Sequence, residues 1–329
     1  MRMIRIGMIS YWHVHAEDYT KQVLENPGCE IAAIWDELPE RGREKAEKYG
    51  VPFFASLDDM LARGGIDAVV VDAPTNIHRD VMVKAAQAGK HIFTEKVVAP
   101  TLREVNEIME AVRKAGVRLA VSLPRLYDDY TQAILGVVRS GRLGRLTQAR
   151  VRLSHNGATA GWLPDHFYSL EQCAGGALID LGCHPMYLVR LFLGMPQSVS
   201  AQFGYVTGKE VEDNAVALLG YENGAVGIVE AGFVNARSPF CIELHGTDGS
   251  LLFGLPDGKL LVSGADWSWE ELPIGGRLPF AFDQWIDHIK DGTEAAENVA
   301  YARDLTALME AANRSAAEGR AVRLDELAQ

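Results

Sequence analysis

The sequence lacks the features that mark membrane-spanning, secreted and nucleic-acid-binding proteins. No stretch approaches the ~18 uninterrupted apolar residues of a membrane-spanning helix, and the beginning, MRMIRIGMIS, has no long apolar run of a secretory signal. The four cysteines show no CxxC or paired-ligand spacing. A formal net charge of -12 gives no global attraction to nucleic acid or anionic lipid. We therefore expect a cytoplasmic protein that binds neither nucleic acid nor membranes.

Glycine is missing at one informative place. The chain has 32 glycines among 329 residues, but none lies between Gly7 and Gly28. In dinucleotide-binding domains the loop after the first strand is rich in glycine, because the backbone must turn tightly and let a pyrophosphate approach the helix N-terminus. Here that loop, residues 10–15, reads SYWHVH. By this criterion alone, the sequence does not indicate a bound nucleotide.

What the sequence contains is typical of a globular protein, with 48% hydrophobic and 23% charged residues. The first 123 residues alternate short β-branched runs with helical patterns, which predicts a parallel sheet with crossover helices. We therefore expect an α/β, Rossmann-like N-terminal domain over residues 1–123. Its predicted strands are Ile4 to Ile9, Glu30 to Trp35, Ala68 to Val71, His91 to Phe93 and Arg118 to Val121.

The pattern changes from about Pro124 onward. Two helical blocks, Tyr130 to Ser140 and Ala177 to Leu193, are interleaved with β-patterned segments that turn signals such as residues 222–224 separate. This pattern predicts an α+β domain over residues 124–329 with a large, mainly antiparallel, open sheet. The predicted strands are Leu146 to Leu153, Val199 to Thr207, Ala215 to Tyr221, Ala225 to Val234 and Phe240 to Leu244, and a terminal helix is expected at Glu297 to Glu318.

Asp36 ends the second predicted strand, 21 residues after His15. In dinucleotide-binding domains an acidic residue ~20 residues beyond the phosphate loop binds the ribose hydroxyls of NAD. Because a carboxylate there repels a 2′-phosphate, Asp36 predicts NAD rather than NADP if either binds. A polar strand end that leads into a turn is the other interpretation, and spacing leaves both open.

Three segments resemble the Gfo/Idh/MocA oxidoreductase family. Residues 69–78, VVVDAPTNIH, and 88–96, AGKHIFTEK, are similar to its P-x-x-x-H and AGKH…EKP segments, with Val97 where the family has proline. Residues 175–185, GGALIDLGCHP, resemble its GGxxxDxGxH segment, and Asp213 with residues 222–225 resembles its sheet strands. Because the matches follow in order over roughly residues 4 to 250, the sequence is identified as a member of this family.

The resemblance implies an NAD-dependent oxidoreductase that transfers hydride from a secondary hydroxyl of a sugar, cyclitol or related polyol. Lys96, Asp180 and His184 match the family's catalytic lysine, aspartate and histidine. The imidazole of His184 suits the base that removes the hydroxyl proton, and Lys96 suits the cation for the developing alkoxide. Asp180 would share a helix face with His184 if the helix is continuous, although Pro185 must kink it or start a new helix.

Two departures from the family accompany this match: Tyr187 replaces the last acid of its common DxGxHxxD segment, and the phosphate loop has no glycine. Asn76 could equally cap a helix, and Glu95 could be a structural partner of Lys96. The residues predicted to bind the cofactor are Ser10, Tyr11, Trp12, His13, Asp36, Pro74, Thr75, Asn76, His78 and Glu95.

The predicted substrate contacts lie in the second half of the chain. Arg125 corresponds to an arginine often seen at the domain junction of the family, where it could contact a substrate oxygen or anchor the two domains. The segment from His155 to His166 is rich in aromatic and polar groups that bind sugars, and a surface loop is the alternative. The residues predicted to bind substrate are Arg125, His155, Trp162, Asp165 and His166.

His13 and His15 also resemble the paired imidazoles of metal-dependent hydrolases. A barrel of that hydrolase type would continue with repeated strand–helix units that carry more histidines, whereas the second half of this chain is predicted to be antiparallel. We therefore expect no metal and interpret one of the two rings as pointing toward a nucleotide phosphate.

Two other functions share the same residues. One is an enzyme that oxidises a sugar transiently, eliminates across the acidified carbon and then reduces the sugar again. Such an enzyme would hydrolyse glycosides with tightly held NAD. A non-catalytic member that lost its cofactor would bind only a sugar or a protein partner, and the rebuilt phosphate loop motivates this alternative. We further expect a homodimer or homotetramer that forms through the C-terminal sheet, as is common in the family.

Overall fold

The computed structural model describes residues 3–254, 257–264 and 267–327. It consists of two compact units. Unit 1 comprises Met1–Ser122 and Pro279–Arg303, and unit 2 comprises Leu123–Leu278 and Asp304–Gln329. Residues 279–303, which the sequence analysis assigned to the C-terminal domain, therefore lie in the first unit.

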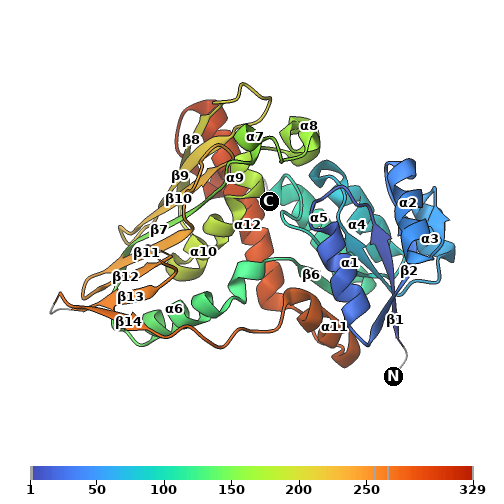
Figure 1. Cartoon of the computed structure of the whole chain (residues 1–329), viewed down its shortest axis with the longest axis horizontal. Helices are drawn as coiled ribbons and strands as arrows, with labels where there is room; N and C mark the ends of the chain where they lie inside the picture. The colour runs from blue at the N-terminus through green and yellow to red at the C-terminus, as the bar shows by residue number, and fades with distance from the viewer. Residues whose placement is uncertain (1–2, 255–256, 265–266, 328–329) are drawn as a thin grey trace. The chain divides into compact units, whose positions relative to one another are not determined.

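Unit 1 is built on a six-stranded parallel sheet in the order β3-β2-β1-β4-β5-β6. This is the doubly wound order of dinucleotide-binding domains, in which ligands bind beyond the carboxyl ends of β1 and β4. Figure 1 labels β1, β2 and β6 of this sheet. The central strands are buried on both faces, as parallel sheets require. The strands are β1 (Ile4–Ile9), β2 (Cys29–Trp35), β3 (Phe53–Phe54), β4 (Ala68–Val71), β5 (His91–Thr94) and β6 (Leu119–Val121).

Three helices of unit 1 begin at residues with clear start signals. Pro39 occupies the first turn of its helix, the Ser56 hydroxyl accepts the Asp59 amide, and Thr101 with Glu104 forms a complete capping box. The helices are α1 (Ala16–Glu25), α2 (Pro39–Tyr49), α3 (Leu57–Arg63), η1 (Thr75–Ile77), α4 (His78–Gln87), α5 (Leu102–Ala115) and α11 (Ala281–Asp291).

The returning segment completes the core of unit 1. The fully buried Trp285 lies 5.7 Å from the ring of Phe93, and its indole N–H donates to the Arg118 carbonyl at 3.2 Å. The Asn298 side chain binds both the amide and the carbonyl of Val121, at 2.8 and 2.9 Å. This contact satisfies the backbone of the edge strand β6 much as a neighbouring strand would.

Unit 2 contains a nine-stranded sheet in the order β14-β13-β12-β11-β7-β10-β9-β8-β15. Among the described strands of this nine-stranded sheet, only β7 and β10 pair in parallel, which confirms the predicted mainly antiparallel sheet. The strands are β7 (Leu146–Ser154), β8 (Ser198–Gly204), β9 (Asn214–Gly220), β10 (Val226–Gly232), β11 (Cys241–Gly246), β12 (Ser250–Phe253), β13 (Leu260–Ser263), β14 (Trp269–Leu272) and β15 (Val322–Arg323). The sequence analysis did not predict β3, β12, β13, β14 or β15.

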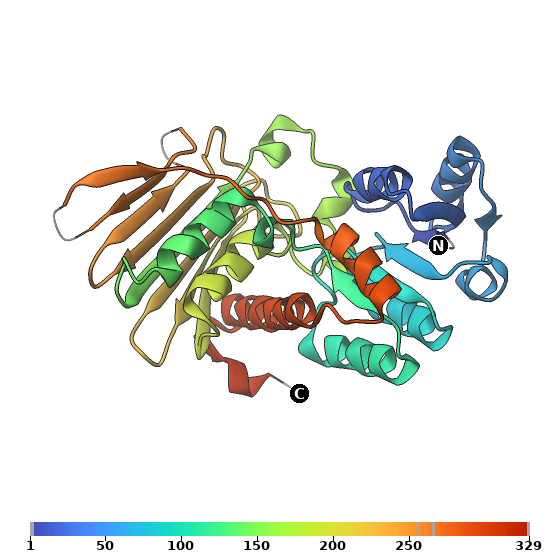
Figure 2. The ribbon, with the colours of Figure 1, turned by 90° about the horizontal axis from the view of Figure 1, so that it is seen from below.

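Helices of unit 2, among them α9 (Ala177–Asp180) and α10 (Cys183–Leu193), pack against one face of this sheet (Figure 2). Along β9, Ala217 and Leu219 are fully buried, whereas Val216 and Leu218 point to the other face and are 38% and 47% exposed. The sheet thus has one covered and one open face. The helices are η2 (Pro124–Leu126), α6 (Asp129–Arg139), α7 (Gly157–Ala160), η3 (Asp165–Tyr168), α8 (Leu170–Cys173), α9 (Ala177–Asp180), α10 (Cys183–Leu193), η4 (Leu324–Glu326) and α12 (Ala296–Glu318), whose first residues belong to unit 1.

The helical block expected from Ala177 to Leu193 is two helices, α9 and α10, separated at Leu181 and Gly182. Pro185 lies in the first turn of α10, where its missing amide costs no helical hydrogen bond. Among the described residues, no single helix is long and apolar enough to cross a membrane, and one pair bent by 51°, Leu170–Asp180 with Cys183–Leu193, passes on length and composition together. The four cysteines are buried, and none forms a disulfide within the described residues.

Candidate active site

A buried carboxylate, Glu95, organises the carboxyl end of the parallel sheet in unit 1. Glu95 follows β5 and is 2% exposed. Its Oε2 accepts the Tyr19 hydroxyl. Its Oε1 lies 3.3 Å from Nδ1 of His15, 3.9 Å from Nε2 of His13 and 3.6 Å from Nζ of Lys96. Burial raises the pKa of Glu95, but the two imidazoles and the Lys96 ammonium outweigh it and hold that pKa below its usual value.

The donor atoms of His13, His15 and Glu95 lie within 4.8 Å of one another, which would admit a metal ion. Two observations oppose that reading. Nδ1 of His13 accepts the His15 amide at 3.2 Å, so the proton of the neutral ring occupies Nε2, the nitrogen nearest Glu95. The Lys96 ammonium already lies beside the same carboxylate oxygen. The cluster is therefore better described as ion pairs and hydrogen bonds around Glu95 than as a cation site.

Asp72, at the carboxyl end of β4, is a second buried acid. It is fully buried, and neither carboxylate oxygen has a hydrogen-bond partner among the described residues. Burial raises the pKa of Asp72 well above its usual value, and the neighbouring charge of Glu95 raises it further. A buried acid without a hydrogen-bond partner at the carboxyl end of β4 lowers the stability of the fold, and functional sites often carry such a cost.

The loop that replaces the glycine-rich turn uses its own backbone amides internally. Ser10 has a positive φ of 71°, the conformation that glycine would normally supply, and Tyr11 and Trp12 are buried. The loop therefore offers no open row of amides of the kind that cradles a pyrophosphate. Five backbone amides of this segment donate hydrogen bonds within the protein: Tyr11 to the Asp36 carboxylate, Trp12 to the Ser10 hydroxyl, His13 to the Asp72 carbonyl, His15 to the His13 ring and Ala16 to the His13 carbonyl.

Asp36 lies at the end of β2, where a ribose would be bound, but its carboxylate is already saturated. Oδ1 accepts from the Leu38 amide at 2.8 Å and from Nη2 of Arg41 at 2.7 Å. Oδ2 accepts from the Tyr11 amide and from Nε of Arg41, both at 2.9 Å. A carboxylate has about four lone-pair sites, so ribose hydroxyls reach Asp36 only if Arg41 moves. The strand ends thus fit a dinucleotide, whereas the loop and the closed Asp36 do not fit it without side-chain movement.

The remaining predicted cofactor residues follow β4. Pro74, Thr75 and Asn76 form the entry to η1, where Asn76 is exposed and caps no helix, since the residue before α4 is Ile77. His78 is 1% exposed, with Nε2 2.8 Å from the Ala73 carbonyl and Nδ1 within 3.2 Å of two further carbonyls. Its ring therefore joins two backbone segments rather than facing a ligand.

In unit 2, the predicted base His184 is held by Tyr187. Nδ1 of His184 lies 2.9 Å from the Tyr187 hydroxyl, which also accepts the Arg125 amide at 3.0 Å. The Arg125 guanidinium lies 4.5 Å from the ring of Phe240 and donates to the Tyr130 hydroxyl at 3.0 Å. The structure thus brings Arg125 and His184 together through Tyr187.

Of the predicted substrate residues between His155 and His166, the structure brings only some together. His155 stacks on Phe233 at 5.1 Å and lies 4.6 Å from Trp162. Burial lowers the pKa of His155, and the charge of Asp180 opposes this shift. Trp162 is 56% exposed, and Asp165 extends into solvent beside Lys209 at 3.8 Å. His166 is half-buried next to Phe167.

Two family models match the chain. One described as "Oxidoreductase family, NAD-binding Rossmann fold" covers residues 4–123, and one described as "GFO/IDH/MocA C-terminal domain" covers residues 131–252. The chain belongs to the Gfo/Idh/MocA family of oxidoreductases. The family identified from the sequence motifs is confirmed.

Within this family, a 1,5-anhydro-D-fructose reductase from Ensifer adhaerens is 28% identical over 76% of this chain and 75% of its own length. A scyllo-inositol 2-dehydrogenase (NAD(+)) from Bacillus subtilis is 28% identical over 77% of this chain and 72% of its own. An oxidoreductase from Agrobacterium radiobacter, solved with NAD+, L-tartaric acid and magnesium, superposes with a TM-score of 0.84 at 23% identity over 98% of each chain. The relatives support the family, and the solved structure supports the fold.

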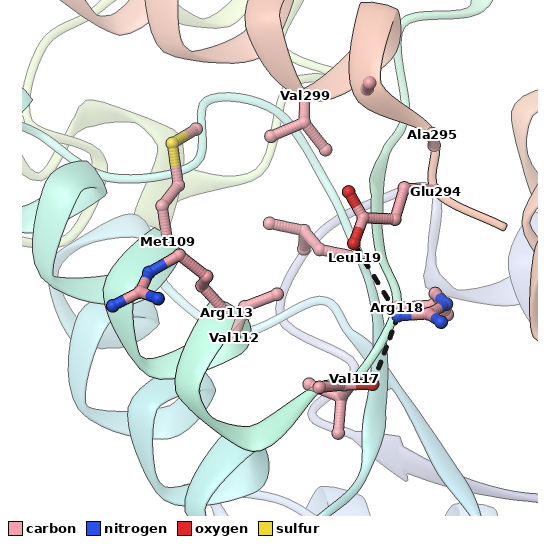
Figure 3. A pocket seen from close by; sticks show the side chains of 11 residues that line it. Met109, Val112, Arg113, Val117, Arg118, Leu119, Glu294, Ala295 and Val299 are labelled. Carbon is pink, nitrogen blue, oxygen red and sulfur yellow. Dashed lines mark hydrogen bonds and ion pairs between the residues drawn. The ribbon is translucent and has the colours of Figure 1, made fainter. Parts of the chain in front are cut away.

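One pocket of unit 1, about 270 Å³ in volume, lies apart from the residues predicted as the Gfo/Idh/MocA site (Figure 3). Met109, Val112, Leu119 and Val299 form its apolar wall, and Glu294 and Arg118 pair at its edge. None of the predicted cofactor or substrate residues lines it.

Three residues of the site escaped the sequence analysis as functional candidates: Tyr19, Arg41 and Asp72. Tyr19 lies one helical turn after His15, so it shares a face with a residue that the sequence analysis considered. Arg41 follows the predicted Asp36 by five residues, and no local pattern singled it out. Asp72 ends an apolar strand, a position that favours ligand contact in parallel sheets.

Asp72 generates a prediction for stability. Because the native pKa is raised, the folded state binds the Asp72 proton more tightly than the unfolded chain does. This contribution to stability is full at low pH and is lost as pH rises from the unfolded value of about 3.9 through the native pKa. Asp72→Asn should therefore raise the free energy of unfolding at pH ~8 by about 1–3 kcal/mol, with a smaller gain near pH ~4.

Urea unfolding at the two pH values measures this difference. Asp291→Asn, at an exposed acid of the same unit, is the control and should stay within about 0.5 kcal/mol of wild type. An Asp72→Asn protein that is less stable than wild type at pH ~8 would contradict the assignment of Asp72 as an unpartnered acid.

Proposed function

We propose that this protein is an NAD-dependent oxidoreductase that acts on a secondary hydroxyl of a sugar, cyclitol or related polyol. One observation carries the proposal: Lys96 stands at the carboxyl end of β5 in a doubly wound sheet, its side chain 2% exposed and its ammonium 3.6 Å from Glu95. The names of the relatives, an anhydrofructose reductase and an inositol dehydrogenase, support the substrate class. NAD, when bound, accepts the hydride from the carbinol carbon.

Lys96, Asp180 and His184 form the proposed catalytic group. A fixed ammonium stabilises the negative charge that develops on the substrate oxygen, and burial makes this stabilisation stronger than it would be in water. Glu95, through Tyr19 and His15, holds the backbone that carries Lys96. Arg125, His155, Trp162, Asp165 and His166 are the proposed substrate contacts, of which His155 and Trp162 form an aromatic wall.

The charges around Asp36 favour NAD over NADP. Arg41 pairs with both Asp36 and Glu37, so two carboxylates face one guanidinium and the local charge remains negative. A 2′-phosphate would meet this excess negative charge. Ribose hydroxyls can replace Arg41 on Asp36, because the Arg41 side chain is 21% exposed and reaches solvent. His15, at the start of α1, is the proposed side-chain donor to a phosphate in place of backbone amides.

Cofactor binding is tested by the melting temperature with each nucleotide. A ligand that binds only the native state stabilises it by about 2.7 kcal/mol at a concentration 100-fold above its Kd. We expect NAD to raise the melting temperature more than NADP, and Arg41→Ala to keep the NAD shift because it frees Asp36. Arg63→Ala, at an exposed arginine of α3, is the control. No shift with either nucleotide at millimolar concentration would contradict the cofactor assignment and favour the non-catalytic alternative.

The role of Lys96 is tested by replacement. Lys96→Ala should lower turnover by on the order of 10²–10³, because one preorganised charge is lost from the reacting oxygen. Initial rates of NAD reduction with a panel of cyclitols and aldoses give the measurement, and thermal melting shows that the variant is folded. Lys21→Ala, at a side chain 71% exposed on α1, is the matched control. Unchanged turnover in Lys96→Ala would overturn the assigned role.

The open face of the unit 2 sheet is the proposed surface for self-association. Val216, Leu218 and Val226 on neighbouring strands expose apolar side chains there, at 38%, 47% and 41%. We expect sedimentation equilibrium to give a mass two or four times 36.0 kDa, and Leu218→Arg to lower it. A wild-type protein that sediments as a monomer would contradict this proposal.

A further inference from the structure

The residue that holds His184 is a tyrosine rather than an acid, and this determines which nitrogen of the ring carries the proton. His184 and Tyr187 lie three residues apart in the first turns of α10, so their side chains share a face. Tyr187 is fully buried. Its hydroxyl has two hydrogen-bond partners, the Arg125 amide at 3.0 Å and Nδ1 of His184 at 2.9 Å.

A count of protons fixes the direction of both bonds. The Arg125 amide can only donate, so the Tyr187 hydroxyl accepts from it. A buried hydroxyl also has to donate its own proton, because an unmet donor away from water is costly. Nδ1 of His184 is the acceptor within reach in the described part of unit 2. Nδ1 is therefore unprotonated, and the neutral ring carries its proton on Nε2.

The surroundings keep the tyrosine protonated. Burial raises the pKa of the Tyr187 hydroxyl well above its usual value, although the Arg125 charge acts in the opposite direction. Protonation of Nδ1 would make the hydroxyl accept two N–H groups and leave its own proton unpaired. The arrangement thus disfavours the neutral tautomer that carries its proton on Nδ1.

We propose that Tyr187 is a positioning residue that fixes His184 in the Nε2-protonated tautomer, so that His184 offers the substrate oxygen an N–H donor instead of a basic lone pair. The identity of the substrate oxygen rests on the proposed function. In this role His184 neither takes up nor releases a proton, which differs from the base expected from the sequence. The proton of the substrate hydroxyl passes to the Lys96 amine, which thereby becomes the ammonium that faces the developing alkoxide, and NAD, when bound, would accept the hydride. An acid at position 187 would accept a proton from Nδ1 and leave Nε2 as the base. The tyrosine therefore changes the chemistry that the same histidine offers.

The tautomer can be read without cofactor or substrate. Long-range ¹H–¹⁵N correlation spectra of protein with ¹⁵N-labelled histidine rings, recorded about two units above the ordinary imidazole pKa of ~6.5, distinguish the two neutral forms. A His184→Gln protein identifies the His184 signal by its absence. We expect the Nε2-protonated pattern in wild type, a mixture of tautomers in Tyr187→Phe and the Nδ1-protonated pattern in Tyr187→Asp.

Tyr221→Phe is the matched control, because it removes a half-buried hydroxyl of the same unit that binds the Gly194 carbonyl and has no contact with His184. Its His184 signal should equal that of wild type. If Tyr187→Asp does not fold, Tyr187→Phe still decides the question. A wild-type His184 protonated on Nδ1, or a Tyr187→Phe spectrum unchanged from wild type, would overturn the proposal.

Activity separates the donor from the base once a substrate of the panel is turned over. Glutamine carries an N–H donor but cannot take up a proton at neutral pH. We expect His184→Gln to stay within about tenfold of wild-type kcat/KM and His184→Ala to lose on the order of 10²–10³. Equal losses in the two variants would overturn the donor role. An absence of any NAD-dependent activity would contradict the proposed function instead, while the spectra would still report the tautomer.

Discussion

A carboxylate taken out of water has to be neutralised by its neighbours, and Glu95 imposes this requirement on the functional edge of unit 1. Its partners are Tyr19 on α1, His13 in the loop before α1 and Lys96, which follows Glu95 in the sequence. One charge therefore fixes three parts of the backbone. Ser122, at the end of β6, joins the network through the Tyr19 hydroxyl at 2.6 Å. Because Tyr19 gives its proton to Glu95, Ser122 donates to Tyr19. The network therefore ties the ends of two neighbouring strands to the first helix.

The rebuilt loop shows how side chains can take over the structural duties of glycine. Ser10 keeps the left-handed backbone that such a turn needs, at a cost of roughly 1–2 kcal/mol for a residue with a Cβ. Its hydroxyl offsets part of that cost by accepting from the Trp12 amide and from Arg41. The turn is thereby closed from within, whereas a glycine loop leaves its amides open to a ligand. Nucleotide binding at this edge becomes a competition with internal partners.

The elements with strong local signals could be predicted from the sequence. β1 and β4 have the predicted bounds, because apolar runs act over a few residues. The short strands β12 to β14 were missed, since their pairing depends on register with distant neighbours. The residues after 278 return to unit 1 through contacts such as Trp285 with Phe93, and no local pattern announces such a contact.

The residues of the candidate site could be predicted from the sequence, but their hydrogen bonds could not. The motifs named Asp36, Glu95, Lys96 and His184, yet which atoms are already satisfied depends on neighbours that lie elsewhere in the sequence. Arg41 occupies Asp36, and the Arg125 amide decides the direction of the Tyr187 bond. The position of a proton is inferred from the hydrogen-bond partners of each atom, and a sequence pattern does not contain this information.

The return of residues 279–303 also bears on how this chain could be divided. A fragment that ends at Ser122 has the whole parallel sheet but lacks Trp285 and Asn298, so it exposes Phe93 and leaves the Val121 amide and carbonyl that Asn298 binds without this partner. Exposed aromatic surface and an open strand edge are the features that drive aggregation. The nucleotide half is therefore not a contiguous module that recombination could move as one stretch of gene. A single stretch of gene that carries both segments of unit 1 also carries strands β7 to β14 of unit 2, which lie between them in the sequence.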